Sequence, residues 1–273
     1  MAGSSLGPYE LMEMLGQGGM GAVFKAKHTR LGKFVAIKVL PTQFTQSLEA
    51  LARFDREMKA VGALEHPNIV RAMDANQHLG THYLVMEYVD GQDLQKFVKQ
   101  HGPLEIGEAC RLIRDSAHAL QHAHEFGLIH RDIKPSNLLL TKSGQLKVLD
   151  LGLARLAGEG NADEGLTTTG TSLGTPDYMA PEQWSDSHTV DFRTDLYALG
   201  CTLYFLLVGR PPFGTEQYRT VVGKLTAHTQ APIPPLRDVR SEVPPALDAL
   251  YQRLLVKNAA DRLASAAELI AAI

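Results

Sequence analysis

The chain contains 273 residues, of which 44% are hydrophobic and 21% are charged. These values are ordinary for a soluble globular protein and exclude a low-complexity, disordered chain. The formal net charge of −3 excludes an overall basic field of the kind that recruits nucleic acid or an anionic membrane. The length allows either one large domain or two smaller ones, with a substantial buried core in either case.

Cysteine content and hydropathy indicate the cellular compartment. The two cysteines, Cys110 and Cys201, lie in apolar segments with helical spacing, so we exclude a disulfide framework and expect a reducing environment. The first residues lack the apolar core of a secretion signal. The longest apolar run, residues 198–208, is about half as long as a membrane-spanning helix. The sequence therefore predicts a cytoplasmic chain without a membrane segment.

The first third of the chain has the patterns of strands with one helix. Residues 9–40 alternate apolar and polar side chains around glycines, which predicts short strands joined by turns. Apolar side chains then recur at helical spacing over residues 47–64, and this helix should stop at residues 66–68, His-Pro-Asn. Two further strands are predicted over residues 69–74 and 83–89.

After a turn at residues 90–91 the chain becomes mostly helical. Residues 158–174 are rich in Gly, Thr and acidic side chains and should form a mobile loop. A strand-rich part followed by a helix-rich part predicts the α+β class. The helices are predicted near residues 93–100, 105–126, 194–208 and 246–256, with strand-like runs at 138–140 and 146–149.

A glycine-rich motif lies within the first predicted strands. Residues 16–21 match the pattern G-x-G-x-x-G, and the strand-like segment that begins at Val23 follows. A dinucleotide-binding fold would require a helix after these glycines, so we favour a hairpin whose backbone covers phosphate groups. On this motif alone, a plain glycine turn remains the alternative.

A lysine ends the strand-like segment of residues 35–38, Val-Ala-Ile-Lys, where its ammonium group could reach nucleotide phosphates. The flexible stem of Lys38 has to be fixed by a carboxylate. Glu57 is the candidate, because it flanks the apolar face of the helix over residues 47–64 and should point inward. The alternative for Glu57 is a solvated charge at the rim of that face.

The segment of residues 130–137 is dense in polar and ionisable side chains between two apolar runs, and Asp150 follows at the end of another strand-like run. The carboxylate of Asp150 and the amide oxygen of Asn137 are ligands that suit Mg²⁺. Asp132 can accept the proton of an incoming hydroxyl, and Lys134 can neutralise a transferring phosphoryl group. These groups predict metal-assisted phosphoryl transfer.

Together these spaced motifs resemble those of the eukaryotic-type protein kinases, and in particular those of the bacterial Ser/Thr kinases. The resemblance implies one catalytic domain over residues 9–273. Its antiparallel N-lobe would cover about 9–88 and its helical C-lobe about 92–273, with a hinge near residues 87–91. It also implies ATP as phosphate donor, Mg²⁺ with Mn²⁺ as a substitute, and protein Ser/Thr hydroxyls as acceptors.

The same resemblance assigns the nucleotide-binding residues. Met86 would be the gatekeeper, Glu87 and Val89 would bind adenine through their backbone, and Asp93 would reach the ribose. The metal motif is Asp-Leu-Gly rather than the commoner Asp-Phe-Gly, and Leu151 is expected to pack in the same way. The full set is Leu15, Gly16, Gln17, Gly18, Gly19, Met20, Gly21, Val23, Ala36, Lys38, Met86, Glu87, Val89, Asp93 and Leu139.

Residues 174–182, Gly-Thr-Pro-Asp-Tyr-Met-Ala-Pro-Glu, resemble the substrate-docking segment of the family. By that resemblance Thr175 would hydrogen-bond Asp132 and fix the base. Glu182 would form a structural ion pair with Arg262 late in the chain.

Two side chains are expected to support the catalytic loop. This loop is the polar segment of residues 130–137. By the resemblance, Asp195 would bind the backbone of the loop from a buried helix, and Arg131 would require an anion to offset its charge. A phosphothreonine in the loop over residues 152–182 would supply about −1.5 to −2 charges. The bacterial spacing maps onto Thr167 and Thr169, where we expect autophosphorylation, and the spacing of many eukaryotic kinases maps onto Thr171. An unmodified polar loop is the alternative.

Other functions fit only parts of the sequence. A catalytically inactive relative would lack part of the Lys, Glu, Asp, Asn and Asp set described above, and here the set is complete. A kinase of small molecules would lack the docking segment. His118, His122 and His124 crowd one predicted helix, but further zinc ligands are not evident, so we favour packing or hydrogen bonding. The resemblance also implies a homodimer through the N-lobe and a longer, membrane-anchored protein.

Overall fold

The computed structural model describes residues 4–18, 21–42, 47–151, 176–185 and 190–273. These residues form two compact units. Unit 1 takes those up to Asp90 together with Asp150 and Leu151, and unit 2 takes those from Gly91 to Leu149 and from Pro176 onward. Every helix in this part of the chain is too short or too polar to span a membrane. The α+β class predicted from the sequence is confirmed.

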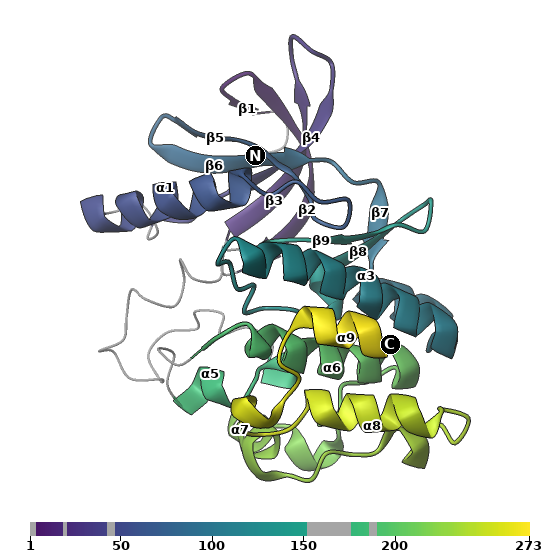
Figure 1. The fold of residues 1–273 in the computed structure, drawn as a ribbon. Coiled ribbons are helices and arrows are strands. Elements are labelled where there is room, and N and C mark those ends of the chain that lie inside the picture. The colour runs from purple at the N-terminus through teal and green to yellow at the C-terminus, as the bar shows by residue number, and fades with distance from the viewer. Residues whose placement is uncertain (1–3, 19–20, 43–46, 152–175, 186–189) are drawn as a thin grey trace. The chain divides into compact units, whose positions relative to one another are not determined.

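Unit 1 is built on a six-stranded antiparallel sheet with the order β1-β2-β3-β4-β6-β5 (Figure 1). The strands predicted over residues 9–40 are present, and β2 and β3 meet at the glycine motif. The six strands are β1 (Ser5–Leu6), β2 (Tyr9–Gly18), β3 (Gly21–His28), β4 (Phe34–Val39), β5 (Ala72–His78) and β6 (Thr81–Glu87).

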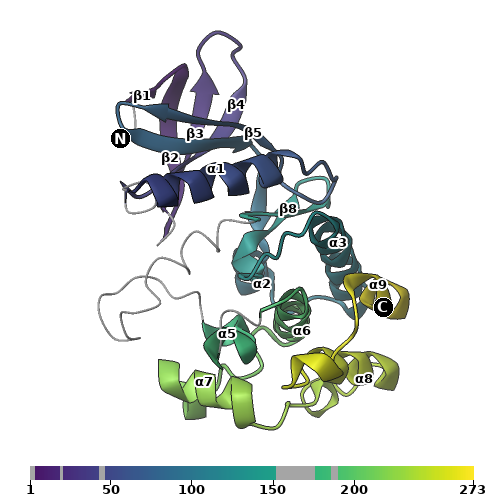
Figure 2. The same cartoon turned by 60° about the vertical axis from the view of Figure 1, so that its left-hand side comes forward.

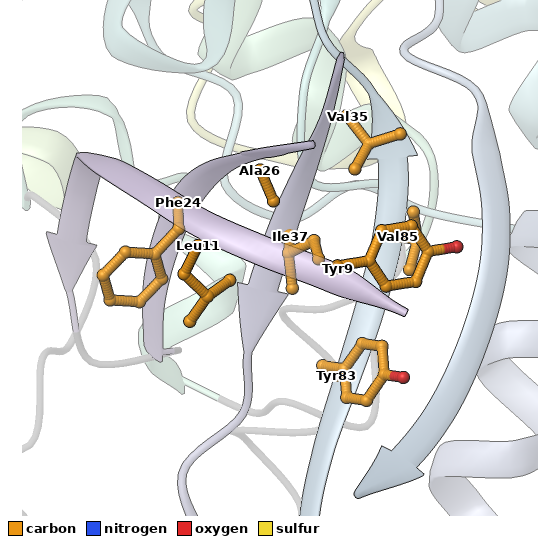
Figure 3. Close-up of a cluster of buried hydrophobic side chains, with 8 residues drawn as sticks. All are labelled: Tyr9, Leu11, Phe24, Ala26, Val35, Ile37, Tyr83 and Val85. Atoms are coloured by element: carbon orange, nitrogen blue, oxygen red, sulfur yellow. The ribbon is translucent and has the colours of Figure 1, made fainter. Parts of the chain in front are cut away.

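The register of the strands divides the side chains of this sheet between two faces. Phe24, Ile37 and Val85 lie opposite one another on three neighbouring strands, within a buried cluster on one face (Figure 3). Because side chains alternate along a strand, Lys38 must point to the other face. The buried cluster consists of Tyr9, Leu11, Phe24, Ala26, Val35, Ile37, Tyr83 and Val85.

Among the described residues of unit 1, α1 (Leu48–Gly62) is a helix that begins where the Ser47 hydroxyl accepts a hydrogen bond from a backbone N–H three residues further on. Phe54 and Met58 are buried, as the helical spacing predicts, and the helix packs against β5. Glu57 lies between them in sequence and is only 4% exposed. The alternative of a solvated rim charge for Glu57 is therefore wrong.

Strand β5 differs from its prediction. The apolar run predicts a strand over residues 69–74, whereas β5 starts at Ala72 and continues through polar side chains to His78. It is an edge strand, so most of its side chains face solvent and hydrophobic patterning cannot mark its extent. It ends in a tight turn in which Leu79 (φ 49°) and Gly80 (φ 79°) are both left-handed, as a two-residue hairpin requires.

Unit 2 is mostly helical, and α6 (Arg193–Val208) lies at its centre (Figure 2). Residues 194–207 are all buried, which explains why this segment is apolar on every side of the helix. Both α3 (Ile106–Glu125) and α8 (Pro245–Leu254) pack against it. Further helices of the unit are α2 (Leu94–His101), α5 (Glu182–Ser185), α7 (Val221–Gln230) and α9 (Ala266–Ala272).

Unit 2 also contains a small antiparallel sheet. The two strand-like runs recognised in the sequence pair with each other as β8 (Leu138–Thr141) and β9 (Leu146–Val148), and β7 (Gly91–Asp93) pairs with β8. The sequence does not predict β7, which has three residues. It also misses α7, which begins with the exposed Val221 and Val222, and α9, which has seven residues.

Candidate active site

The segment that follows α3 brings three polar side chains together in unit 2. Lys134 Nζ lies 2.9 Å from Asp132 Oδ1 and 2.8 Å from Oδ2. The Asn137 amide nitrogen donates to Asp132 Oδ2 at 3.0 Å and to the Asp132 carbonyl at 2.7 Å. The carboxylate of Asp132 is thereby oriented from two sides, while its side chain stays 22% exposed and accessible.

Asn137 is held in an orientation that suits a metal ligand. Both of its side-chain hydrogen bonds use the amide nitrogen, so the amide oxygen is the atom that a divalent cation would take. The Asn137 carbonyl accepts a hydrogen bond from Leu149 N at 2.9 Å, which ties this turn to the end of β9. Asp150 follows directly but belongs to unit 1, so a metal shared by Asn137 and Asp150 stays a prediction.

Asp195, near the start of α6, holds the backbone of the catalytic loop. Its Oδ2 accepts a hydrogen bond from His130 N at 3.0 Å, and its Oδ1 accepts one from Arg131 N at 2.8 Å. The side chain is fully buried. Burial by itself would raise the pKa of Asp195, but the hydrogen bond from His124 and the neighbouring His130 outweigh it, so the pKa is lowered and the carboxylate stays charged.

His124, on α3, also supports the catalytic loop through Asp195, and sequence reasoning missed it. Its Nε2 lies 2.9 Å from Asp195 Oδ2. The sequence shows only a crowd of histidines on one helix, and nothing in it links His124 to a residue on α6. Within the described ranges, no group of three or more His, Cys, Asp or Glu side chains is arranged to hold a metal ion.

The backbone at Arg131 is left-handed (φ 65°), which is uncommon for a residue with a side chain. Asp132 N donates to His130 Nδ1 at 3.2 Å, and His130 Nε2 lies 2.7 Å from Leu149 O. The His130 ring therefore connects this unusual turn to the end of β9. The residues expected to supply a phosphate for Arg131 or to fix the base, namely Thr167, Thr169, Thr171 and Thr175, lie outside the described residues.

In unit 1, Lys38 is 3% exposed, and its Nζ lies 2.9 Å from Asp150 Oδ1. Asp150 is left-handed as well (φ 59°), and Leu151 beside it is buried. The predicted contact between Lys38 and Glu57 stays a prediction, because the described contact of the ammonium group is with Asp150.

Most of the residues assigned to the nucleotide belong to unit 1. Val23 pairs with Lys38, and Ala36 pairs with Met86, across adjacent strands. The alternation of side chains places all four on the face opposite the buried cluster. Also in unit 1 are Leu15, Gly16, Gln17, Gly18, Gly21, Glu87 and Val89, whereas Gly19 and Met20 lie outside the described residues.

Asp93 and Leu139 belong to unit 2 and lie opposite each other in the β7–β8 pair. Asp93 Oδ1 accepts a hydrogen bond from Lys96 N at 2.8 Å and so begins α2, and its Oδ2 lies 3.0 Å from Lys96 Nζ. A ribose contact at Asp93 would therefore use a carboxylate that already caps a helix.

The segment with the docking pattern lies beside the predicted base within unit 2. A small hollow is lined by Arg131, Asp132, Ile133, Tyr178 and Met179. Residues of both segments thus border the same space.

Helix α7 supports this segment from the side. Lys224 Nζ lies 2.7 Å from both carboxylate oxygens of Asp177, in the turn Pro176–Tyr178. One turn further along α7, the buried His228 ring lies 2.8 Å from the Tyr197 hydroxyl. Burial lowers the pKa of His228 to about 3, with the nearby Lys257 acting in the same direction, so the ring is neutral at pH 7.

The end of the docking segment is anchored by an ion pair between Glu182 and Arg262. The two guanidinium nitrogens lie 2.6 and 2.7 Å from the two carboxylate oxygens, and the Arg262 side chain is fully buried. The Thr194 hydroxyl donates to Glu182 at 2.8 Å. Burial would raise the pKa of Glu182, but Arg262 outweighs it and the pKa is lowered. This bidentate geometry suits a structural anchor.

Sequence reasoning also missed Gln183, which follows Glu182. Its side-chain carbonyl accepts a hydrogen bond from Ala180 N at 2.9 Å, and its amide nitrogen donates to the Arg131 carbonyl at 2.8 Å. Both partners are backbone atoms, so no pattern of side chains could have indicated them.

Comparison with known proteins identifies the family of this chain. Residues 9–272 match the family model described as a protein kinase domain. The chain is 40% identical over 268 residues to the serine/threonine-protein kinase PknD of Mycobacterium tuberculosis, covering 98% of this chain and 39% of that protein. It is also 40% identical to the serine/threonine-protein kinase PknB of Mycolicibacterium smegmatis, covering 96% of this chain and 41% of that protein.

The fold is similar to a crystal structure of the Mycobacterium tuberculosis PknI kinase domain, with a TM-score of 0.78 and 30% identity, covering 100% of this chain and 96% of that chain. The chain spans less than half the length of PknD and PknB. The family uses ATP and a divalent metal ion to phosphorylate proteins. This chain belongs to the protein kinase family, as a catalytic domain of the ATP-dependent serine/threonine type.

Proposed function

We propose that this domain transfers the γ-phosphate of ATP to serine and threonine hydroxyls of proteins with Asp132 as the base. The geometry around Asp132 supports this proposal. Its carboxylate is oriented by Lys134 and Asn137, remains accessible, and borders the same hollow as Tyr178 of the docking segment. A carboxylate so oriented is suited to accept the proton of a docked hydroxyl.

In the proposed step, the substrate hydroxyl oxygen forms a bond to the γ-phosphorus and its proton passes to Asp132. The bond between the γ-phosphorus and the β–γ bridging oxygen breaks, and ADP leaves. Lys134, whose Nζ lies 2.8 Å from Asp132 Oδ2, would offset the charge on the transferring group. Thr175 would complete the orientation of the base.

Asn137 and Asp150 are proposed as ligands of the divalent ion, with Mg²⁺ as the metal and Mn²⁺ as a substitute. Their oxygen-only donor set suits these hard cations. When bound, the ion would offset the negative charge of the phosphates. Because Lys38 already contacts Asp150 at 2.9 Å, this carboxylate would be shared between the ammonium group and the metal.

The sheet face that carries Val23, Ala36, Lys38 and Met86 is proposed to bind the nucleotide, with the ammonium group of Lys38 on its phosphates. Glu57 is proposed to support Lys38, since it is buried on α1 at 4% exposure. A buried carboxylate needs a positive or hydrogen-bonding partner, and a phosphate-binding lysine needs a fixed stem.

Autophosphorylation within residues 152–182 is proposed as the activating step, at Thr167 and Thr169 with Thr171 as the third candidate. The left-handed backbone of Arg131 adjoins the base, so an anion that binds its guanidinium group would act close to the chemistry. Intact mass and peptide mapping after incubation with ATP should find phosphate in residues 167–171. A chain that phosphorylates other proteins while these residues stay unmodified would refute this step.

The wider setting of the domain is also proposed. We propose protein substrates in the cytoplasm, a homodimer through the strand-rich unit, and membership of a longer membrane-anchored protein. Both cysteines are free, and Cys201 is buried, which supports a reducing compartment.

The transfer reaction can be tested with Asp132→Asn. We expect this variant to bind ATP with unchanged affinity in calorimetry and to transfer phosphate to a Ser/Thr peptide library about 10²–10⁴-fold more slowly. Asp238→Asn, at an exposed carboxylate of unit 2, is the matched control and should be as active as the wild type. Unchanged transfer by Asp132→Asn would contradict its role as the base.

A further inference from the structure

Gln183, in α5, joins the docking segment to the catalytic loop through one side-chain amide. The carbonyl oxygen of this amide accepts a hydrogen bond from Ala180 N at 2.9 Å. The amide nitrogen donates to the Arg131 carbonyl at 2.8 Å. One planar group therefore sets the spacing between a backbone atom of the docking segment and a backbone atom next to the base.

The Arg131 carbonyl belongs to the peptide group that leads directly into Asp132. The N–H of that peptide group donates to His130 Nδ1 at 3.2 Å. The N–H of the preceding peptide group, at Arg131, donates to Asp195 Oδ1 at 2.8 Å. Both peptide groups that flank Arg131 are thus held, and Gln183 supplies the contact on the carbonyl side.

This support matters because Arg131 has a left-handed backbone with φ 65°. A residue with a β-carbon keeps such a conformation only when its surroundings enforce it. If the peptide group between Arg131 and Asp132 rotates, the direction in which the Asp132 side chain leaves the backbone rotates with it. A hydrogen bond on that carbonyl therefore acts on the orientation of the base.

We propose that Gln183 is a positioning residue for phosphate transfer. It holds the Asp132 carboxylate in a fixed position relative to the docking segment. This proposal rests on the proposed function of Asp132. Neither hydrogen bond of Gln183 involves a residue assigned to the nucleotide. Loss of Gln183 should therefore lower kcat for peptide phosphorylation and leave the KM for ATP unchanged.

A purely structural role for Gln183 would also lower stability, so a matched control is needed. Gln121 on α3 likewise accepts one hydrogen bond and donates one, away from the site. Its carbonyl oxygen accepts a hydrogen bond from Ala267 N at 3.0 Å, and its amide nitrogen donates to Glu125 at 3.0 Å. Gln121→Met therefore removes one accepted and one donated hydrogen bond of a side-chain amide without touching the catalytic loop.

The first test compares Gln183→Met with Gln121→Met in steady-state assays with a Ser/Thr peptide. We expect Gln183→Met to lower kcat about tenfold with a KM for ATP within about twofold of wild type, and Gln121→Met to keep both within about twofold. Equal kcat for the two variants would overturn the proposal. Equal thermal stability of the two variants would exclude unfolding as the cause of the loss.

Gln183→Glu offers a second test that is specific to the bond with Arg131. A carboxylate still accepts from Ala180 N but cannot donate to the Arg131 carbonyl, whereas a protonated carboxyl group can donate. The ratio of variant to wild-type kcat should therefore rise as the pH falls from 8 toward about 5, because the new carboxyl becomes protonated. A low ratio that does not change with pH would contradict the proposed bond.

A third measurement separates failure of this proposal from failure of the proposed function. Hydrogen exchange at the backbone N–H of Asp132 should be faster in Gln183→Met than in wild type and in Gln121→Met, whether or not the domain is active. If the wild type transfers no phosphate, the function of Asp132 is refuted, and hydrogen exchange still tests whether Gln183 holds the backbone at Arg131. If Asp132→Asn abolishes transfer while Gln183→Met changes neither kcat nor hydrogen exchange, only the positioning role of Gln183 is refuted.

Discussion

The catalytic loop of unit 2 and the lysine of unit 1 are held in place by different means. The loop before Asp132 binds through its backbone N–H groups to Asp195, a carboxylate with no solvent exposure. Lys38 contacts Asp150, whose side chain is 26% exposed and which stands where the chain passes from unit 2 into unit 1. The base is therefore preorganised within one unit, whereas the partner of the lysine is more open to solvent.

The energetic consequence of this difference is large. Removing an acceptor from a fully buried network leaves several hydrogen-bond donors without partners, and each such donor lowers the free energy of unfolding. In the Lys38–Asp150 pair the carboxylate is partly exposed, so water can replace the contact that the acid loses when the lysine is removed. Substitutions in the catalytic-loop support should therefore reduce stability more than substitutions at Lys38, whose main effect should be on activity.

Asp195→Ala should have the largest effect. It removes the acceptor for His130 N, Arg131 N and His124, so we expect the free energy of unfolding to fall by about 3–5 kcal/mol. Guanidinium-induced unfolding followed by the fluorescence of the sole tryptophan, Trp184, would measure this loss. A loss below about 1 kcal/mol would mean that the loop is supported mainly by other contacts.

Lys38→Met should change activity strongly and stability less than Asp195→Ala does. Methionine keeps an apolar stem in the buried site, and Asp150 can turn toward water. We expect phosphate transfer to fall about 10²-fold or more, and the free energy of unfolding to fall by less than it does in Asp195→Ala. Lys27→Met, at an exposed lysine of β3, is the control for both measurements. A loss of stability as large as that of Asp195→Ala would show that the two regions are held alike.

Acid should weaken unit 2 through His228, whose folded-state pKa is lowered to about 3. Below about pH 6.5 the unfolded chain binds a proton at this imidazole, and the native state does not. The free energy of unfolding is therefore unaffected by His228 above about pH 6.5 and decreases as the pH falls below it. Between pH 6.5 and 5 this amounts to about 2 kcal/mol. His228→Gln should have a shallower dependence of unfolding free energy on pH, and equal slopes for both proteins would contradict this assignment.

The contact between Asp177 and Lys224 should have the smallest effect of the four. Asp177→Asn should raise the KM for a peptide substrate about fivefold and leave the KM for ATP unchanged, because a partly solvated ion pair contributes about 1 kcal/mol. The exchanged pair, Asp177→Lys with Lys224→Asp, should recover part of the loss in a double-mutant cycle. Additive effects of the single substitutions would show that the ion pair does not couple α7 to the docking segment.

Those elements of the fold that bury a regular apolar pattern could be predicted from the sequence. The spacing of apolar residues marks α3 and α6, because each buries a long stretch of side chains. The same rule fails for β5, an edge strand with mostly exposed side chains, and for β7, which is three residues long. Pairing with a neighbouring strand, rather than hydrophobic pattern, makes these two segments strands.

The candidate site divides in the same way. The sequence indicates Asp132, Lys134 and Asn137, because several polar side chains between apolar runs need a function. It does not indicate Gln183 or the contact of His124 with Asp195. Gln183 binds backbone atoms, and His124 and Asp195 lie on helices that only folding brings together, so neither leaves a pattern in the sequence.

The assignment of Asp150 to unit 1 has a consequence for how such a domain can be divided or recombined. Unit 1 is assembled from two separate stretches of the gene, with the first and smaller part of unit 2 encoded between them. A recombination event that moved only the codons for residues 1–90 would transfer Lys38 without the carboxylate that contacts it here. The strand-rich half of this enzyme is therefore not an exchangeable module, and chimaeric kinases should be joined outside residues 9–272 rather than at residues 90–91.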